Sequence, residues 1–371
     1  MKSNIIHYFF SLVAAGLWEK DLFLSTKEEI DFSEIFRIAE EQSVEGLVAA
    51  GLEHLKDYKI PKEIALTFAG ITLQLEQRNT SMNDFISVIV EKMRAKSIYT
   101  LLLKGQGIAC CYHRPLWRAC GDIDFFLSDE NYKKAKGFLL PLATSIEPEG
   151  KRNKHVGMTL DSWVVELHGS LRCGLSPSLD RVLDDIYNNT FYDGAVRSWM
   201  NGDFQVSLLN ATNDAAYVFT HFLSHFYKGG VGLRQICDWC RLLWTYKDEI
   251  NHKILLERLK KMKAVTEWKA FGAFAVEYLG MPKEAMPFYD SSSKWRNKAN
   301  RIKDFILMSG NFGHSRNMDY YGKYPYLIRK VISMGRRIGD LFQHARIFPL
   351  DSLKFLPNIV FNGLKAASRG E

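Results

Sequence analysis

Two aspartates in one short segment are the residues best suited to carry chemistry. Asp122 and Asp124 alternate with the apolar residues Ile123 and Phe125. At the two-residue period of a β-strand, both carboxylates point to one face of the strand and both apolar side chains to the other. Two carboxylates on one face repel each other unless a cation lies between them. Oxygen ligands of this kind suit Mg²⁺, which usually completes its shell with substrate phosphates.

A third carboxylate lies in a later apolar run. Glu166 is the single acid within residues 163–168, which have the composition of a strand. A two-metal site for phosphoryl or nucleotidyl transfer typically needs about three carboxylates to hold ions roughly 4 Å apart. We therefore expect Asp122, Asp124 and Glu166 to act together from neighbouring strands. A solvated edge strand is the alternative for the aspartate pair, but its apolar surroundings favour a central strand.

The residues around these acids match a known pattern. Lys104 and Gly105 follow an apolar run over residues 99–103, Arg118 lies shortly before Gly-Asp-Ile-Asp, and Val-Glu-Leu-His surrounds Glu166. With these residues the chain resembles the uncharacterised nucleotidyltransferase family within the DNA polymerase beta-like superfamily. The motif-bearing part covers about residues 95–172.

The resemblance implies a metal-dependent nucleotidyltransferase that moves a nucleoside monophosphate from a nucleoside triphosphate to a hydroxyl-type acceptor. Asp122, Asp124 and Glu166 would be the catalytic and metal-binding residues, with Mg²⁺ or Mn²⁺ as the cofactor. The acceptor is open between a small molecule, a protein hydroxyl and an RNA end. The predicted substrate-binding and phosphate-binding residues are Lys104, Gly105, Gln106, Arg118, Arg234 and Asp238. Arg234 and Asp238 lie one helical turn apart, so pairing with each other is the alternative for them.

Two further functions stay open. Gln106 stands where the superfamily commonly has Ser or Gly, which would suit a catalytically silent nucleotide-binding or interaction module. From Lys323 to the end, nine Lys or Arg face three Asp or Glu, and Arg329 to Arg337 interleave with apolar residues. Such a basic amphipathic helix can lie on an anionic membrane, contact RNA or pack on the body of the protein. The net charge of +7 fits an anionic substrate in each case.

The elements that must position these residues predict an α+β fold, with a small mixed β-sheet nucleotidyltransferase core between large N- and C-terminal helical regions. We expect residues 1–97 to form the N-terminal helical region, residues 98–205 the core and residues 206–371 the C-terminal helical region. A long helix over residues 62–94 should lead into the first strand. In the core we expect helices on one side of the sheet, and over residues 173–206 a linker with short helices.

The remaining polar and apolar signals have structural explanations. His221 and His225 share one helical face, but no third metal ligand is evident, so core or interdomain histidines are favoured. The six cysteines are interpreted as reduced thiols. The apolar residues 5–17 imitate a signal peptide, yet His7 and Tyr8 interrupt them, which favours a helix packed on the body. No apolar run reaches a membrane-spanning length, so we expect a soluble cytoplasmic protein.

Overall fold

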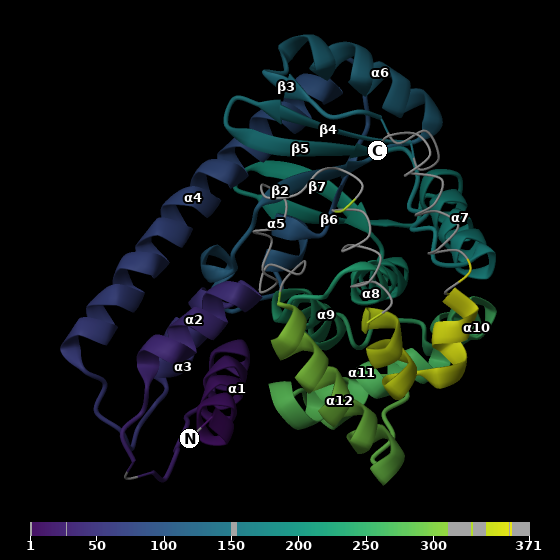
Figure 1. Cartoon of the computed structure of the whole chain (residues 1–371). Coiled ribbons are helices and arrows are strands. Elements are labelled where there is room, and N and C mark those ends of the chain that lie inside the picture. Colours follow the sequence, from purple (N-terminus) through teal and green to yellow (C-terminus); the bar gives the residue numbers. More distant parts are fainter. Residues whose placement is uncertain are drawn as a thin grey trace.

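The computed structural model describes residues 2–26, 28–149, 154–310 and 339–355, together with residues 328 and 357. These residues form one mixed seven-stranded sheet surrounded by helices (Figure 1). The α-helices are α1 (Lys2–Trp18), α2 (Phe32–Gln42), α3 (Glu45–Glu53), α4 (Lys62–Arg94), α5 (Gly105–Ala109), α6 (Asp129–Leu139), α7 (Pro177–Phe191), α8 (Ala211–Lys228), α9 (Leu233–Thr245), α10 (His252–Met262), α11 (Val265–Leu279) and α12 (Ser293–Ser309). The strands are β1 (Leu101–Leu103), β2 (Asp122–Phe126), β3 (Ser145–Ile146), β4 (His155–Leu160), β5 (Trp163–His168), β6 (Val196–Asn201) and β7 (Phe204–Leu209). Short 3-10 helices lie at Pro115–Trp117, Leu140–Leu142 and Lys283–Ala285.

The aspartate-bearing strand β2 lies at the centre of the sheet. The strand order is β3-β4-β5-β2-β1-β7-β6, so β2 has a hydrogen-bonded neighbour on each side. It runs antiparallel to β1 and parallel to β5. The prediction of a central strand rather than a solvated edge strand is therefore confirmed.

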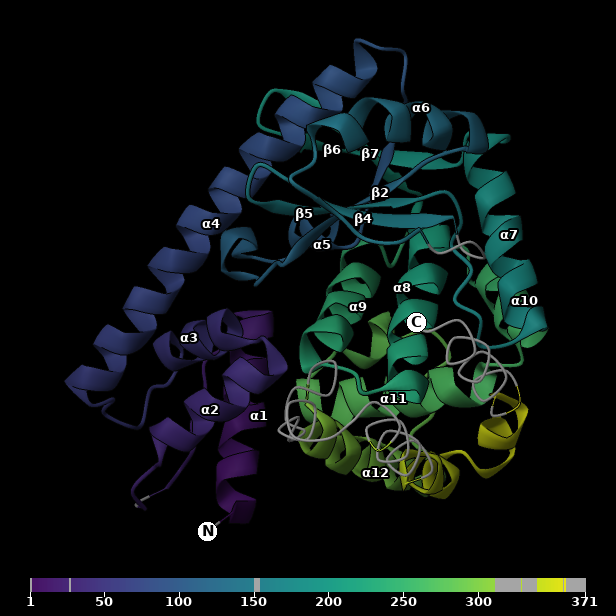
Figure 2. The same ribbon diagram turned by 45° about the horizontal axis from the view of Figure 1, so that its top comes forward.

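The apolar side chains of β2 determine which face of the sheet carries the acids. Ile123 and Phe125 are buried in a cluster with residues of α4 and α6, such as Met82 and Leu139. Asp122 and Asp124 alternate with them and so point to the opposite face. Figure 2 shows α6 on one side of the sheet and α8 and α9 on the other. The acids are thus directed toward the helical body that contains α8.

That helical body holds the larger hydrophobic core. α1, α2 and α3 pack beside α4, while α8, α9, α11 and α12 form a second group beneath the sheet (Figures 1 and 2). Aromatic side chains fill its centre, and Phe219, Trp239 and Trp268 are fully buried with ring centroids 4.7–5.8 Å apart. Because side chains of this size bury a large apolar area, their packing holds α8 in place opposite the acids.

Several predictions for individual elements are confirmed. The fold is α+β with helical N- and C-terminal regions, and α4 spans the residues expected for the long helix. Asp31 and Ser128 cap α2 and α6, each accepting a hydrogen bond from the backbone N–H three residues later. The apolar residues 5–17, which imitate a signal peptide in the sequence, form part of α1, and this helix packs on α3. Among the described residues, no helix has both the length and the apolar character required to cross a bilayer.

The interpretation of residues 173–206 as a linker is wrong. This segment contains the 15-residue helix α7 and a β-hairpin of β6 and β7, and β7 continues past residue 205 to Leu209. β6 lies at the sheet edge with most side chains part-exposed, so its sequence shows little apolar alternation. β7 joins the sheet through β1, with Leu101 beside Ser207. The β7–β1 pairing joins residues too far apart to leave a local pattern, but the two-residue turn Gly202-Asp203 between β6 and β7 is a local hairpin signal that the linker interpretation overlooked.

Two smaller expectations also differ from the structure. Helices cover both faces of the sheet, not one. The side chain of Thr212 suits a cap for α8, but the cap is Asn210, which accepts from the N–H of Asn213, while Thr212 accepts from the N–H of Asn251. The basic stretch from Arg329 to Arg337 lies outside the described residues.

Candidate functional site

Strand register brings the three predicted acids together. β2 and β5 are parallel neighbours, and Asp124 stands directly beside Glu166. Aligned residues on neighbouring strands share a face of the sheet. The carboxylates of Asp122, Asp124 and Glu166 all lie within 4.8 Å of one another, with Asp124 buried and the other two part-exposed. The predicted cluster is present on the face directed toward α8.

A tight turn places a lysine against this cluster. Lys104 and Gly105 connect β1 to α5 with φ angles of 49° and 46°. Leu103 is aligned with Asp124, and the turn after it sets Lys104 Nζ 3.1 Å from Asp124 Oδ1. A side chain at Gly105 would add strain at this positive φ, and its Cβ would approach Cys120 Sγ to 3.3 Å. The glycine therefore allows the turn that delivers Lys104.

Two histidines that the sequence analysis did not select complete the cluster. His168 Nε2 lies 2.8 Å from Asp124 Oδ1 and 3.3 Å from Glu166 Oε2. His155 Nε2 lies 3.0 Å from Glu166 Oε2. His168 follows Glu166 by two residues, so strand period alone places it on the same face. His155 could not be found in this way, because it joins the cluster through the pairing of β4 with β5.

The charges of the cluster change the pKa values of its members. The charge of Asp124 and then burial raise the pKa of Asp122. Burial would raise the pKa of Glu166, but hydrogen bonds with His155 and His168 lower it overall. Burial likewise opposes the charged form of Lys104, yet Asp124 raises its pKa. The cluster thus combines carboxylates that are crowded together with a lysine that stays charged.

Histidine 168 is also shifted toward its charged form. Burial acts against the charge, but hydrogen bonds to Asp124 and Glu166 raise its pKa overall. The two acids therefore attract positive charge from their neighbours. Three carboxylate oxygens at this spacing are hard ligands of the type that Mg²⁺ and Mn²⁺ accept, so the residues present fit a divalent cation.

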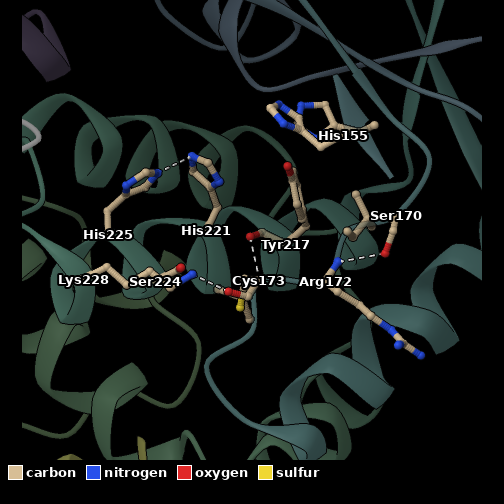
Figure 3. Close-up of a pocket in the computed structure, with 12 residues that line it drawn as sticks. His155, Ser170, Arg172, Cys173, Tyr217, His221, Ser224, His225 and Lys228 are labelled. Atoms are coloured by element: carbon tan, nitrogen blue, oxygen red, sulfur yellow. Dashed lines mark hydrogen bonds between the residues drawn. The ribbon is translucent and has the colours of Figure 1, made fainter. Parts of the chain in front are cut away.

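A cavity of about 180 Å³ adjoins the cluster (Figure 3). The start of β4, the end of β5 and the segment after β5 form one wall, and α8 forms the other. The lining residues are His155, His168, Ser170, Leu171, Arg172, Cys173, Tyr217, Thr220, His221, Ser224, His225 and Lys228. The cavity gives a ligand access to the histidine side of the cluster.

The α8 histidines face this cavity as a pair. His221 Nε2 lies 3.2 Å from His225 Nε2 and 3.4 Å from Lys104 Nζ. Burial, and then the charge of Lys104, lower the pKa of His221 well below its usual value and that of His225 to about 4. The spacing correctly predicts a shared face, and both rings are neutral at pH 7.

Other predicted site residues are held in the interior. The Arg118 guanidinium donates to both carboxylate oxygens of Asp238, at 3.0 and 2.5 Å, and Tyr112 Oη also donates to Asp238. The partner of Asp238 is thus Arg118, not Arg234. Arg234 instead donates to the carbonyl of Ala119.

Gln106 also lies apart from the acids. Its side chain is buried, and its Nε2 donates to Asn79 Oδ1 at 2.8 Å. Asn79 belongs to α4 and also donates to the carbonyls of Leu116 and Arg118. Gln106 therefore helps to fix α5 and the loop before β2 against α4. Only its backbone is left for the predicted contact with phosphate.

The fold and site together define an α+β protein whose central sheet presents a carboxylate cluster suited to a divalent cation. Comparison with protein families gives the narrower assignment. The model of the family described as uncharacterised nucleotidyltransferase matches residues 28–280, which include every residue of the cluster. The chain belongs to this family, and membership supports nucleotidyl transfer as its general activity. Searches of curated proteins and of solved structures returned no match.

Proposed function

We propose that this protein is a metal-dependent nucleotidyltransferase that moves a nucleoside monophosphate from a nucleoside triphosphate to a hydroxyl-type acceptor. The observation that carries the proposal is the gathering of Asp122, Asp124 and Glu166 within 4.8 Å in a member of a nucleotidyltransferase family. Their face of the sheet also holds Lys104, which supplies positive charge where phosphates would lie.

The three acids would hold Mg²⁺ or Mn²⁺. Bound divalent ions would neutralise the charge that develops on the transferring phosphoryl group. Glu166 is better suited to hold charge than to accept a proton from the acceptor hydroxyl, because its lowered pKa makes it a weak base. The charge of Asp124 raises the pKa of Asp122, so a bound cation would favour the ionised form of Asp122.

Two cations remain as candidates for phosphate binding. Lys104 stays protonated beside Asp124. Arg234 is part-exposed on α9 and lies close enough to Asp122 to oppose the rise in its pKa. Arg118 and Asp238 already neutralise each other in the interior. We therefore assign that pair to positioning of the loop before β2, not to contact with the nucleotide.

The silent-module alternative loses its main support. It depended on Gln106 in place of a small residue at the phosphate-binding turn, but this side chain is directed into the core toward Asn79. The residue thus has a packing role that leaves the acid cluster open. The cavity beside the cluster is lined by His155 and His168, which contact the acids, so it provides room for a reactant on the histidine side of the cluster.

Thermal unfolding with each of the four nucleoside triphosphates, with and without Mg²⁺ or Mn²⁺, tests the proposal. A ligand that binds the folded state stabilises it by about 2.7 kcal/mol at 100 times its Kd. Wild type and an Asp203→Asn control, changed in the exposed β6–β7 turn, should show a metal-dependent shift with at least one triphosphate. Asp122→Asn should lose it. No shift in wild type, or an unchanged shift in Asp122→Asn, would remove the proposed site.

A further inference from the structure

The histidine side of the cluster forms a second set of metal ligands. His155, Glu166 and His168 each offer one ligand atom, and these atoms lie within 4.8 Å of one another. We propose that they bind a transition-metal ion of the Zn²⁺ type, next to the oxygen-only set of Asp122 and Asp124. Zinc binding can be measured directly, so this inference goes beyond nucleotidyl transfer and does not depend on it.

Sheet geometry preorganises these three ligands. Glu166 and His168 are two residues apart on β5 and share its face, while His155 stands directly opposite His168 on β4. All three side chains therefore start from neighbouring positions of two paired strands, which limits their motion. Sites built on strands in this way hold their geometry better than sites built on loops.

The distances between the ligand atoms suit a small ion. His155 Nε2 and His168 Nε2 lie 3.0 and 3.3 Å from Glu166 Oε2. A tetrahedral Zn²⁺ with bonds of about 2.0–2.1 Å separates its ligand atoms by about 3.3 Å. Both distances to Glu166 are therefore within a few tenths of an ångström of this value, and all three ligand atoms lie within 4.8 Å of one another.

The donor types select a different ion from the one expected at the aspartates. Imidazole nitrogens favour Zn²⁺ and related transition metals, whereas Mg²⁺ prefers oxygen ligands. Two histidines and one glutamate are a ligand set known from catalytic zinc sites, which keep a fourth position open. His155 and His168 both line the cavity, so the open position would be accessible from there. Glu166 has two carboxylate oxygens, so it can serve both ligand sets.

The competing explanation is that the histidines are hydrogen-bond partners that orient the acids. His168 supports it, because its Nε2 also lies 2.8 Å from Asp124 Oδ1. The α8 histidines are the contrast: His221 Nε2 and His225 Nε2 lie 3.2 Å apart, but no third ligand joins them among the described residues. Metal binding must therefore be measured, and it must depend on both His155 and His168.

The test titrates the chelator-treated full chain with Zn²⁺ by calorimetry and with Co²⁺ by visible absorption. Wild type should bind one Zn²⁺ and show Co²⁺ d–d bands without thiolate charge-transfer bands. His155→Gln and His168→Gln should each weaken binding by about 100-fold or more, because loss of a mere outer-sphere partner already costs about 10- to 100-fold. His252→Gln, changed at an exposed histidine of α10, should match wild type.

Three results would overturn the inference: no Zn²⁺ binding in wild type, wild-type affinity in either histidine variant, or thiolate bands that place the ion on cysteine. Circular dichroism checks that the variants fold. If His168→Gln does not fold, the result for His155→Gln decides, because His155 is the more exposed of the two. Failure here with an intact triphosphate shift would remove only the zinc site. Zinc binding without any triphosphate shift would leave this site and remove the proposed function.

Discussion

The acid cluster and the Arg118–Asp238 pair are two carboxylate networks that the same loop connects, and they are built on opposite rules. In the pair, one guanidinium meets one carboxylate through two hydrogen bonds, and both side chains are at most 6% exposed. In the cluster, three carboxylates share Lys104 and two histidines beside a cavity. The pair is electrically complete within the protein, and the cluster is not.

This difference separates a structural role from a functional one. A buried ion pair needs its partner because an unpaired charge in the interior is costly. In a cluster of like charges, repulsion lowers the stability of the folded state but increases the affinity for a cation or an ionised ligand. Sequence reasoning placed Arg118 and Asp238 in the substrate site, and in the structure they pair with each other in the interior. Removing one charge should therefore lower the free energy of unfolding in the pair and leave it unchanged or raise it in the cluster.

The largest expected effect is on the pair. Arg118→Met leaves Asp238 buried without its counter-charge, so the free energy of unfolding should fall by about 3–5 kcal/mol. Urea unfolding measures this loss. The double variant with Asp238→Leu should recover part of it, since no charge is then left unpaired. A loss below about 1 kcal/mol in the single variant would show that the pair is not structural.

The neutral histidines of α8 should give the next largest effect. The pKa of His225 is about 4 in the folded protein and about 6.5 when unfolded, so the unfolded state binds the extra proton first. Stability should be fully present above pH 6.5 and fall by up to about 3 kcal/mol as the pH drops to 4. Urea unfolding across this range should show a smaller fall for His225→Gln. Equal slopes in both proteins would refute the assignment.

A smaller effect is expected at the turn that delivers Lys104. Gly105 has a φ of 46°, and alanine in a left-handed conformation costs roughly 1–2 kcal/mol. Gly105→Ala should lose this amount in urea unfolding and also weaken the metal-dependent triphosphate shift. Gly137→Ala, where an added Cβ meets nothing within 4 Å, is the control and should not be destabilised. Loss of stability with an unchanged shift would separate the turn from the site.

The smallest stability change is expected at Asp122, and it should have the opposite sign from that at Arg118. A folded pKa raised above the unfolded value means that the ionised carboxylate destabilises the fold. In metal-free buffer at neutral pH, Asp122→Asn should match or slightly exceed wild type in urea unfolding. The difference should shrink as the pH falls through the raised pKa. A clear loss of stability in Asp122→Asn would contradict the contrast between the two networks.

Prediction from sequence succeeded where the signal was local. The alternation of Asp122 and Asp124 with Ile123 and Phe125 determined the face of each side chain, because strand period is a property of the backbone. The long helix α4 was also found from local pattern. Glu166 was selected by its isolation in an apolar strand, and the structure brings it to the aspartates.

Prediction failed where contacts join distant residues. The place of β7 beside β1 was missed because this pairing crosses more than a hundred residues, whereas the β6–β7 turn at Gly202-Asp203 was a local signal that was not used. The partners of Arg118 and Gln106 were also not foreseen, since Asp238 and Asn79 lie on other helices. His155 enters the cluster only through the register of β4 against β5.

The sequence by itself thus determined the chemical types available and the strand face on which the acids lie. Tertiary structure decided which polar groups neutralise one another and which remain available for a ligand. The physical reason is that charge and burial depend on neighbours in space. Two residues of the same type, Asp122 and Asp238, receive different environments from the strands and helices packed around them.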